Sequence, residues 1–280
     1  MRIAISCEST CDLPKEMIEK YDIKVIRLGI NLEDKTYVDG VDITTEKLFE
    51  LVDEKQELPK TSAKGSEEYK EFFEEILKSY DAVIHVGFSS ELSCSFQNAS
   101  LAVRELKRAY IVDSKNLSSG HGMLVLEAVE LASQGLSPEE IVEKLNRLTD
   151  RISTSFVINT MKFLYKGGRC TGVQYFGANL LKIKPSIIVE EGKMKVGKKY
   201  IGKITECAIK YINDTLSMTN NVNKDRIFLT YSSSRELNIP KIKEYLETKG
   251  FKEIIVNTAG CTVSTHCGPD CVGIIFKQDM

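Results

Sequence analysis

Short apolar runs alternate with amphipathic stretches through the first half of the chain. The runs are too short and too apolar for exposed helices and predict strands at residues 3–6, 24–30, 82–86 and 109–112. The stretches repeat apolar residues every three or four positions and predict helices at residues 45–52, 66–78, 92–107, 117–133 and 137–148. Ser137 and Glu140 have the spacing of a capping box, with Pro138 at the first helical position. This alternation predicts a largely parallel sheet with helices on both faces.

The pattern changes near residue 150 and predicts a second α/β unit. A strand at 152–158 precedes a helix at 159–165, a glycine-rich break and a second helical pattern that runs through Leu180. A hairpin is predicted from strands 186–190 and 193–196 around Glu191 and Gly192, followed by helices at 206–218 and 240–248 and strands at 226–231, 253–257 and 271–276. A chain of 280 residues has room for two cores, so we expect two α/β domains, 1–152 and 153–280.

The composition is that of an ordinary soluble globular protein. Hydrophobic residues make up 42%, charged residues 28%, and the net charge is −2, which argues against disorder and against a nucleic-acid surface. The apolar run at residues 1–6 is too short for a signal peptide or a membrane span. We therefore expect a cytoplasmic protein without a transmembrane segment.

Eight cysteines occur in this chain, and without a secretory signal most should be reduced core residues. The pairs Cys7/Cys11 and Cys267/Cys271, the second beside His266, raise the possibility of zinc. Structural zinc sites use a two-residue spacing more often than this three-residue one, so we expect no metal.

The most informative segment is 89–99, which follows a predicted buried strand and opens a helix. Hydroxyl and thiol side chains lie beside the free amides of a helix N-terminus, an arrangement that suits a carboxylate or phosphate. Four predicted loop segments are rich in Ser, Thr or Gly, at residues 7–13, 61–66, 89–95 and 112–122. Any single serine there is better explained as a helix cap or turn former, but the four segments together favour a ligand site at the carboxyl ends of the strands.

Catalytic motifs are incomplete. The sequence from Gly87 to Glu91 lacks the second glycine of a nucleophile elbow, although Ser93 and His266 could still meet in space. No phosphate loop and no dinucleotide fingerprint occurs, so no nucleotide cofactor is expected.

Other candidate residues have two readings. Arg169 follows two glycines, which would either present it to a phosphate or merely cap the helix predicted to end at Tyr165. We interpret His85 as a core histidine and place His266 in a loop, and the role of His121 is left open.

Seven segments resemble motifs of the DegV family, the fatty-acid-binding proteins that act as substrate subunits of bacterial fatty acid kinase. They are 5–14, 58–62, 92–93 with Ala99, 112–114, 163–169, 182–185 and 266–269. The resemblance runs the whole length, and the order and spacing of the segments are specific.

The resemblance implies a protein that buries a long-chain fatty acid between two α/β domains and presents its carboxylate to a separate ATP-dependent kinase subunit, holding the acyl phosphate product. Thr61 and Ser93 would hydrogen-bond the carboxylate, and Arg169 and His266 would serve either the carboxylate end or kinase docking. Burying about fourteen methylenes gives on the order of 11 kcal/mol of binding free energy. The acyl chain would therefore supply most of the affinity, and the hydroxyl groups would fix the position of the carboxylate. Such a subunit needs no catalytic residue of its own; the alternatives are a serine hydrolase using Ser93 and His266, or a lipid-responsive regulatory module.

Four positions depart from the family pattern. Glu8 stands where Asp is usual, residues 63–66 replace a Gln-Pro-Ser continuation, and Cys94-Ser95 replaces Gly-Thr, adding bulk next to the anion. Only Lys199 and Lys203 stand where an arginine usually precedes the segment 204–216, and lysine makes no bidentate contact. These changes predict a differently shaped head-group end.

Overall fold

The computed structural model describes residues 1–171 and 183–279. The helical pattern predicted through Leu180, and Lys182 of one family segment, lie outside the described residues.

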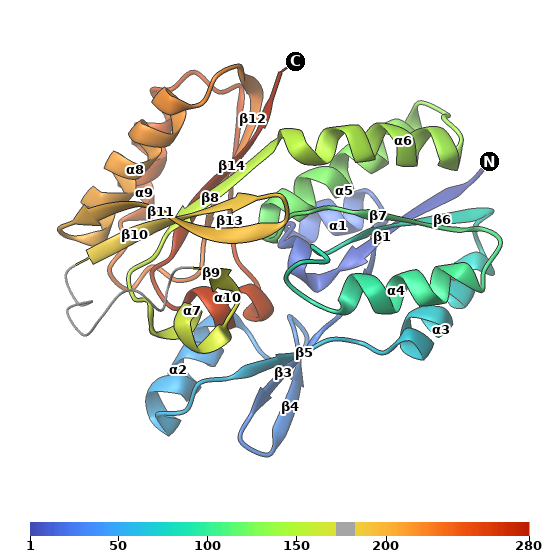
Figure 1. Ribbon diagram of the computed structural model, residues 1–280, viewed down its shortest axis with the longest axis horizontal. Coiled ribbons are helices and arrows are strands. Elements are labelled where there is room, and N and C mark those ends of the chain that lie inside the picture. Colours follow the sequence, from blue (N-terminus) through green and yellow to red (C-terminus); the bar gives the residue numbers. More distant parts are fainter. Residues whose placement is uncertain (172–182, 280) are drawn as a thin grey trace.

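The first half builds the predicted parallel sheet. Its strand order is β2 (Lys24–Ile26), β1 (Ile3–Glu8), β6 (Ala82–Gly87) and β7 (Ala109–Asp113), and every neighbouring pair is parallel. One face packs against α3 (Ser66–Leu77) and α4 (Ser95–Arg104), and the other against α5 (Ser118–Ser133) and α6 (Pro138–Leu148) (Figure 1). The capping box of α6 is confirmed, because Ser137 Oγ accepts from the Glu140 amide and Glu140 accepts from the Ser137 amide. The prediction of a sheet covered on both faces is confirmed.

The segment 24–30, predicted as one strand, contributes residues to two different sheets. The chain leaves the parallel sheet after β2 and enters a small antiparallel sheet of order β4-β3-β5, built from β3 (Gly29–Leu32), β4 (Lys35–Val38) and β5 (Lys60–Ser62), with α2 (Thr45–Lys55) beyond β4. A Cβ on Gly29 would lie 2.3 Å from Ser62 Oγ, so the close pairing of β3 with β5 needs glycine there. The apolar run is continuous, so nothing in its pattern marks the change of sheet. The short elements α1 (Lys15–Lys20), β4 and β5 were not predicted.

The second half forms a mixed sheet of seven strands. Their order is β13 (Glu253–Thr258), β12 (Val222–Tyr231), β14 (Val272–Gln278), β8 (Ile152–Val157), β10 (Ile183–Glu190), β11 (Lys193–Ile201) and β9 (Cys170–Thr171). The predicted β10–β11 hairpin is present, and α8 (Ile204–Met218) and α9 (Ile239–Glu247) cover one face. The helix predicted at 159–165 is α7 (Lys162–Gly167), which begins three residues later.

His266, predicted in a loop, lies in the unpredicted helix α10 (Cys261–Cys267). The first turn of this helix is held from far away in the sequence, because the Asp39 carboxylate accepts from the amides of Cys261 and Thr262. A helix capped by a distant carboxylate leaves no local signature, which is why the prediction was wrong.

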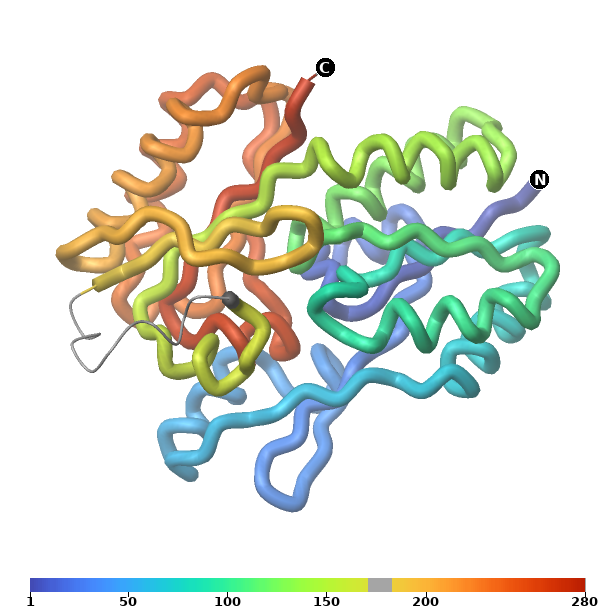
Figure 2. Tube along the Cα trace, viewed as in Figure 1, coloured from blue at the N-terminus to red at the C-terminus, as the bar shows by residue number. Residues whose placement is uncertain are grey.

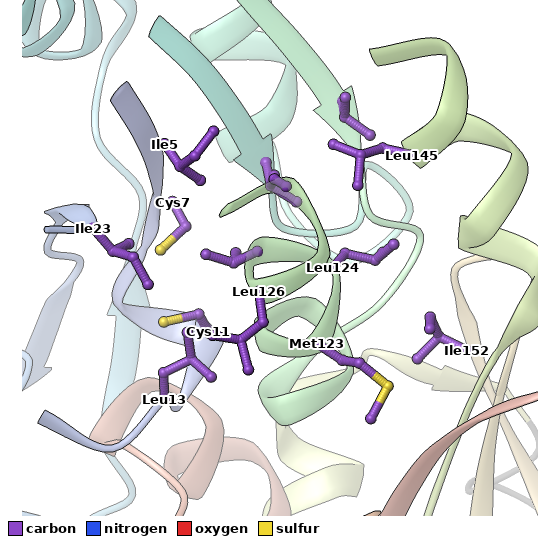
Figure 3. Packing of buried hydrophobic residues seen from close by; sticks show 14 of the residues in the cluster. Ile5, Cys7, Cys11, Leu13, Ile23, Met123, Leu124, Leu126, Leu145 and Ile152 are labelled. Carbon is purple, nitrogen blue, oxygen red and sulfur yellow. The ribbon is translucent and has the colours of Figure 1, made fainter. Parts of the chain in front are cut away.

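The two halves meet along α5. One apolar cluster joins β1, α5 and α6 to Ile152 of β8 and to residues of β12, β13 and β14; Figure 3 shows Cys7, Leu124, Leu145 and Ile152 within it. The tip of the β10–β11 hairpin also reaches the first half, where Ser89 Oγ donates to the Gly192 carbonyl at 2.8 Å (Figure 2). The domain boundary at 152/153 stays a prediction.

The eight cysteines are free, and all except the exposed Cys94 are buried, as expected for reduced core residues. Within residues 1–171 and 183–279, no helix has the length and apolar character needed to cross a membrane.

Candidate functional site

The four predicted site residues line one cavity. The space between its walls, counted out to the open solvent at its mouth, is about 610 Å³, and its wall includes Thr61, Ser93, Arg169 and His266. The remaining wall is mainly apolar, and its larger side chains are Phe88, Leu92, Leu117, Phe156, Leu164 and Met194. The structure therefore brings together residues that are up to 205 positions apart in the sequence.

Thr61 on β5 and His266 on α10 are a bonded pair. Thr61 Oγ1 lies 3.0 Å from His266 Nε2. His266 Nδ1 is buried and hydrogen-bonds to none of the described groups, and it packs so closely on Gly167 that a Cβ there would lie 2.5 Å away. Burial, followed by the charge of Arg169, lowers the pKa of His266 to about 4. The imidazole is therefore neutral at neutral pH.

Ser93 lies just before α4, in the segment that the sequence singles out. Its Oγ accepts from the Ser95 amide at 3.1 Å and lies 2.9 Å from Ser95 Oγ. These contacts start the helix at Ser95 rather than at Leu92 as predicted, because the residues before it form a side-chain-stabilised turn. Cys94 is exposed and is not part of the cavity wall, so the expected bulk beside the anion is wrong.

Arg169 lies at the boundary between the cavity and the outside. Gly168 takes the left-handed conformation that ends α7, so the capping interpretation of the double glycine is confirmed. Arg169 is exposed, donates to the Gly167 carbonyl, and lines both the cavity and an outer cleft of about 1300 Å³. Thr61 and His266 also line both spaces, and Lys60, Lys162 and Lys166 add positive charge to the cleft. Thr61, Arg169 and His266 thus stand between the cavity and the outer cleft, and the rest of the cavity wall is mainly apolar.

A second cavity, with about 360 Å³ of space counted out to the solvent, lies against the seven-stranded sheet. It shares Leu117, Phe156, Val263 and Cys267 with the first cavity, so the two lie side by side. Residues of β8, β12 and β14 form its far wall.

Three of the four predicted hydroxyl-rich segments contribute to the first cavity, and segment 7–13 does not. That segment turns under α5 and α10 instead, where Asp12 accepts from Ser118 Oγ at 2.6 Å and from the Gly260 amide at 2.8 Å. Its polar groups hold the elements around the cavity together.

Sequence reasoning named Glu8 only as a departure from the family pattern and did not predict that it is a buried acid outside the cavity wall. Glu8 ends β1, is fully buried, and accepts from Tyr69 OH and from the Phe88 amide, both at 2.9 Å. Its Oε1 also lies 3.3 Å from His85 Nε2. Burial by itself would raise the pKa of Glu8, but His85 and then His121 outweigh it and lower this pKa to about 2. An acid that directly ends an apolar strand is the sequence signal that could have found it.

The two remaining histidines belong to this buried group. His85 is a core residue as predicted, with Nδ1 3.0 Å from Ser6 Oγ. His121, left undecided, is buried with Nε2 2.7 Å from the Val86 carbonyl oxygen, and burial lowers its pKa.

The contacts do not pair Ser93 with His266 as the hydrolase alternative requires. His266 bonds Thr61, whereas the hydrogen bonds of Ser93 run to Ser95. In the described part of the chain, no three His, Cys, Asp or Glu side chains are grouped so that they could hold a metal ion.

Comparisons with known proteins agree with this architecture. The model of a family described as "Uncharacterised protein, DegV family" matches residues 2–279. A DegV domain-containing protein of Caldanaerobacter subterraneus subsp. tengcongensis is 34% identical over 280 residues, and protein DegV of Bacillus subtilis is 31% identical over 286 residues, each alignment covering 99% of both chains.

Solved structures with the same fold cover 100% of both chains. One is described as fatty acid binding by a DegV family protein from Thermus thermophilus, with a TM-score of 0.91 and 29% identity. Another is DegV of Bacillus subtilis, described as a fatty acid binding protein, with a TM-score of 0.87 and 29% identity. With the family match over nearly its whole length, this chain belongs to the DegV family.

Proposed function

We propose that this protein binds a long-chain fatty acid and presents its carboxylate to a separate ATP-dependent kinase subunit. The observation that carries the proposal is one cavity whose wall is mainly apolar and includes Thr61, Ser93, Arg169 and His266. An apolar cavity with a few convergent polar groups suits an amphiphile with one anionic end. The fatty acid binding described for the Thermus thermophilus and Bacillus subtilis relatives supports the same ligand.

The carboxylate would be held by hydroxyl donors. A neutral His266 that carries its proton on Nε2 donates to Thr61 Oγ1, which leaves the Thr61 hydrogen free for the ligand. Ser93 would provide the second donor. Each hydrogen bond to a charged group adds about 1.5 to 3 kcal/mol, whereas burial of the chain contributes roughly 0.8 kcal/mol per methylene.

The acyl chain would run inward along the apolar wall. Phe88, Leu92 and Phe156 line the first cavity, and Phe156 continues into the second cavity. The second cavity would receive the end of a long chain.

Presentation to a kinase would occur at the outer cleft. Arg169 lines both the cavity and this cleft, and three lysines of the cleft suit phosphate groups. The chain carries no phosphate loop, so ATP would be bound by the partner, and this protein would then hold the acyl phosphate.

Extraction of purified protein tests the ligand. We expect about one long-chain fatty acid per chain by mass spectrometry, and a higher melting temperature after fatty acid is added to delipidated protein, because a ligand that binds only the folded state stabilises it. Folded protein that yields no acyl species and is not stabilised by any fatty acid from C12 to C20 would contradict the proposal.

Arg169→Ala tests presentation. With a kinase subunit and ATP, we expect acyl phosphate formation to fall at least tenfold while fatty acid affinity changes less than twofold, since Arg169 is exposed at the mouth. Arg104→Ala, which removes an exposed cation at the far end of α4, is the matched control. Equal losses of binding and turnover would place Arg169 in the binding site alone, and acyl phosphate made without a partner would contradict the two-subunit arrangement.

A further inference from the structure

Helices α7 and α10 approach each other through a glycine on each side. A Cβ on Gly268, which follows α10, would lie 2.6 Å from Phe163 Cδ2 of α7. A Cβ on Gly167 of α7 would lie 2.5 Å from His266 Nδ1 of α10. Neither distance leaves room for a methyl group. The two helices are therefore packed at a separation that needs glycine at both positions.

The contact between Gly167 and His266 has a defined direction. The Cβ position on Gly167 lies 3.4 Å from Cε1 and 3.5 Å from Cγ, the two ring atoms bonded to Nδ1. These distances are nearly equal and much longer than the 2.5 Å to Nδ1, so the position lies close to the ring plane, on the outward axis of Nδ1. A hydrogen on Nδ1 would point along that axis. Gly167 already places its own hydrogen there.

This geometry decides which ring nitrogen of neutral His266 carries the proton. Nδ1 is buried, hydrogen-bonds to none of the described groups and faces Gly167, so a proton there would be crowded and unpaired. Nε2 lies 3.0 Å from Thr61 Oγ1, which can accept its proton. The Thr61 hydrogen then stays available to an anion. The opposite tautomer would use that hydrogen in a bond to the ring.

Gly167 makes a second contact, through its backbone, with another residue of the cavity wall. Its carbonyl accepts from Arg169 Nη1 at 2.6 Å. One glycine thus contacts both His266 and Arg169. A methyl group at position 167 would displace the ring but keep the carbonyl, so mutation can separate the two contacts.

We propose that Gly167 is a positioning residue, which fixes the orientation of His266 and keeps the proton of its ring on Nε2. The proposal rests on the proposed function for the identity of the ligand, but the arrangement exists without ligand. Gly167 lines the outer cleft and is not part of the cavity wall. Its effect on fatty acid binding must therefore pass through the residues that it contacts.

Nitrogen NMR of ligand-free protein tests the tautomer. We expect protein labelled with ¹⁵N-histidine to show His266 at neutral pH as a neutral ring with its proton on Nε2, and His266→Gln assigns the signal. In Gly167→Ala the ring must move, so this signal should shift or divide between the two tautomers. The wild-type spectrum decides the tautomer even if the variant does not fold. A wild-type ring that carries its proton on Nδ1, or a spectrum that Gly167→Ala leaves unchanged, would overturn the inference.

A double-mutant cycle tests the consequence for binding. Gly167→Ala should lower the affinity for palmitate about fivefold when Thr61 is present. In a Thr61→Val background, which keeps the shape of the side chain without the hydroxyl, the loss should be less than about twofold. Equal losses in both backgrounds would contradict a route through His266 and Thr61.

Gly65→Ala is the matched control. It adds the same methyl group where the nearest heavy atom, Glu68 Oε2, is 3.7 Å away, so affinity should stay unchanged. A loss in this control as large as that in Gly167→Ala would count against a specific role of Gly167. A wild-type protein that binds no palmitate would overturn the proposed function, and the NMR spectra would still decide the role of Gly167.

Discussion

At the scale of single residues, the polar part of the cavity wall combines neutral hydrogen-bond donors with one exposed cation, Arg169. Thr61 and Ser93 are half-buried hydroxyls, and His266 is kept neutral by burial and by Arg169. Neutral donors cost little to desolvate, whereas a buried cation would cost several kcal/mol without a partner. A site that must receive and release an anion is therefore better served by hydroxyls than by a buried lysine or arginine.

Ser93→Ala should weaken fatty acid binding without changing the fold. The variant loses one hydrogen bond to a charged group and leaves the apolar walls intact, so the affinity should fall by roughly 1.5 to 3 kcal/mol, which is about 10- to 150-fold. Titration calorimetry with a C16 fatty acid measures this, and Ser100→Ala, on α4 but outside the cavity wall, serves as the control. A covalent acyl adduct on Ser93 after exposure to an activated ester would favour the hydrolase instead.

At the scale of elements, α10 is placed by residues from the opposite end of the chain. Asp39, just after β4, accepts from the Cys261 amide at 2.9 Å and from Thr262 Oγ1 at 2.7 Å, and Ser9 Oγ donates to it at 3.0 Å. Later in the same helix, His266 meets Thr61 of β5, a strand of the sheet that Asp39 follows. The small antiparallel sheet thus holds both ends of the helix that carries the histidine.

Asp39→Ala should destabilise the protein and reduce ligand affinity together. It leaves two amides and two hydroxyls without their acceptor, and we expect a loss of about 2 to 4 kcal/mol in the free energy of unfolding. Urea unfolding followed by circular dichroism measures this loss. Asp34→Ala, in the exposed turn between β3 and β4, is the control and should change the free energy of unfolding by no more than about 0.5 kcal/mol. If the two variants are equally stable, Asp39 does not hold α10.

At the scale of the whole molecule, a buried acid joins the two halves. Asp12 accepts from Ser118 on α5 and from the Gly260 amide before α10, and its carbonyl accepts from Asn257 Nδ2 of β13 at 2.5 Å. Burial raises the pKa of Asp12 to about 8; the bonds from Ser118 and Gly260 oppose this, and the charge of Asp39 adds to it. The junction of the halves is therefore sensitive to pH.

The sign of that sensitivity follows from the protons bound in each state. Between pH 4 and about 8, Asp12 keeps its proton in the folded protein but releases it in the unfolded chain. The contribution of Asp12 to stability is therefore greatest at low pH and is lost as the pH rises through this window. The slope approaches about 1.4 kcal/mol per pH unit. Asp12→Asn should remove it.

Urea unfolding of both proteins from pH 5 to 8 checks this prediction. The difference between them isolates Asp12, because His266 and His121, whose lowered pKa values add stability as pH rises toward their unfolded values, contribute equally to both. Parallel stability curves would show that Asp12 is ionised in the folded protein.

The sequence by itself determined the local order of this protein. The alternation of β1, α3, β6, α4, β7 and α5, the capping box of α6 and the β10–β11 hairpin all follow from patterns within about fifteen residues, where periodicity and turn chemistry act. Ser93 stood out because its segment follows a predicted strand, and the family segments gave Thr61 and Ser93 an expected role.

Only the tertiary structure decided what depends on contacts between distant residues. The run at 24–30 divides between two sheets because β5, some thirty residues later, pairs with β3. Helix α10 forms against Asp39, and His266 reaches Thr61 rather than Ser93. Glu8 accepts from the Phe88 amide only because β1 and β6 lie side by side. Each of these contacts joins residues far apart in the sequence, and the partner is chosen by how the sheets and helices pack rather than by the local sequence.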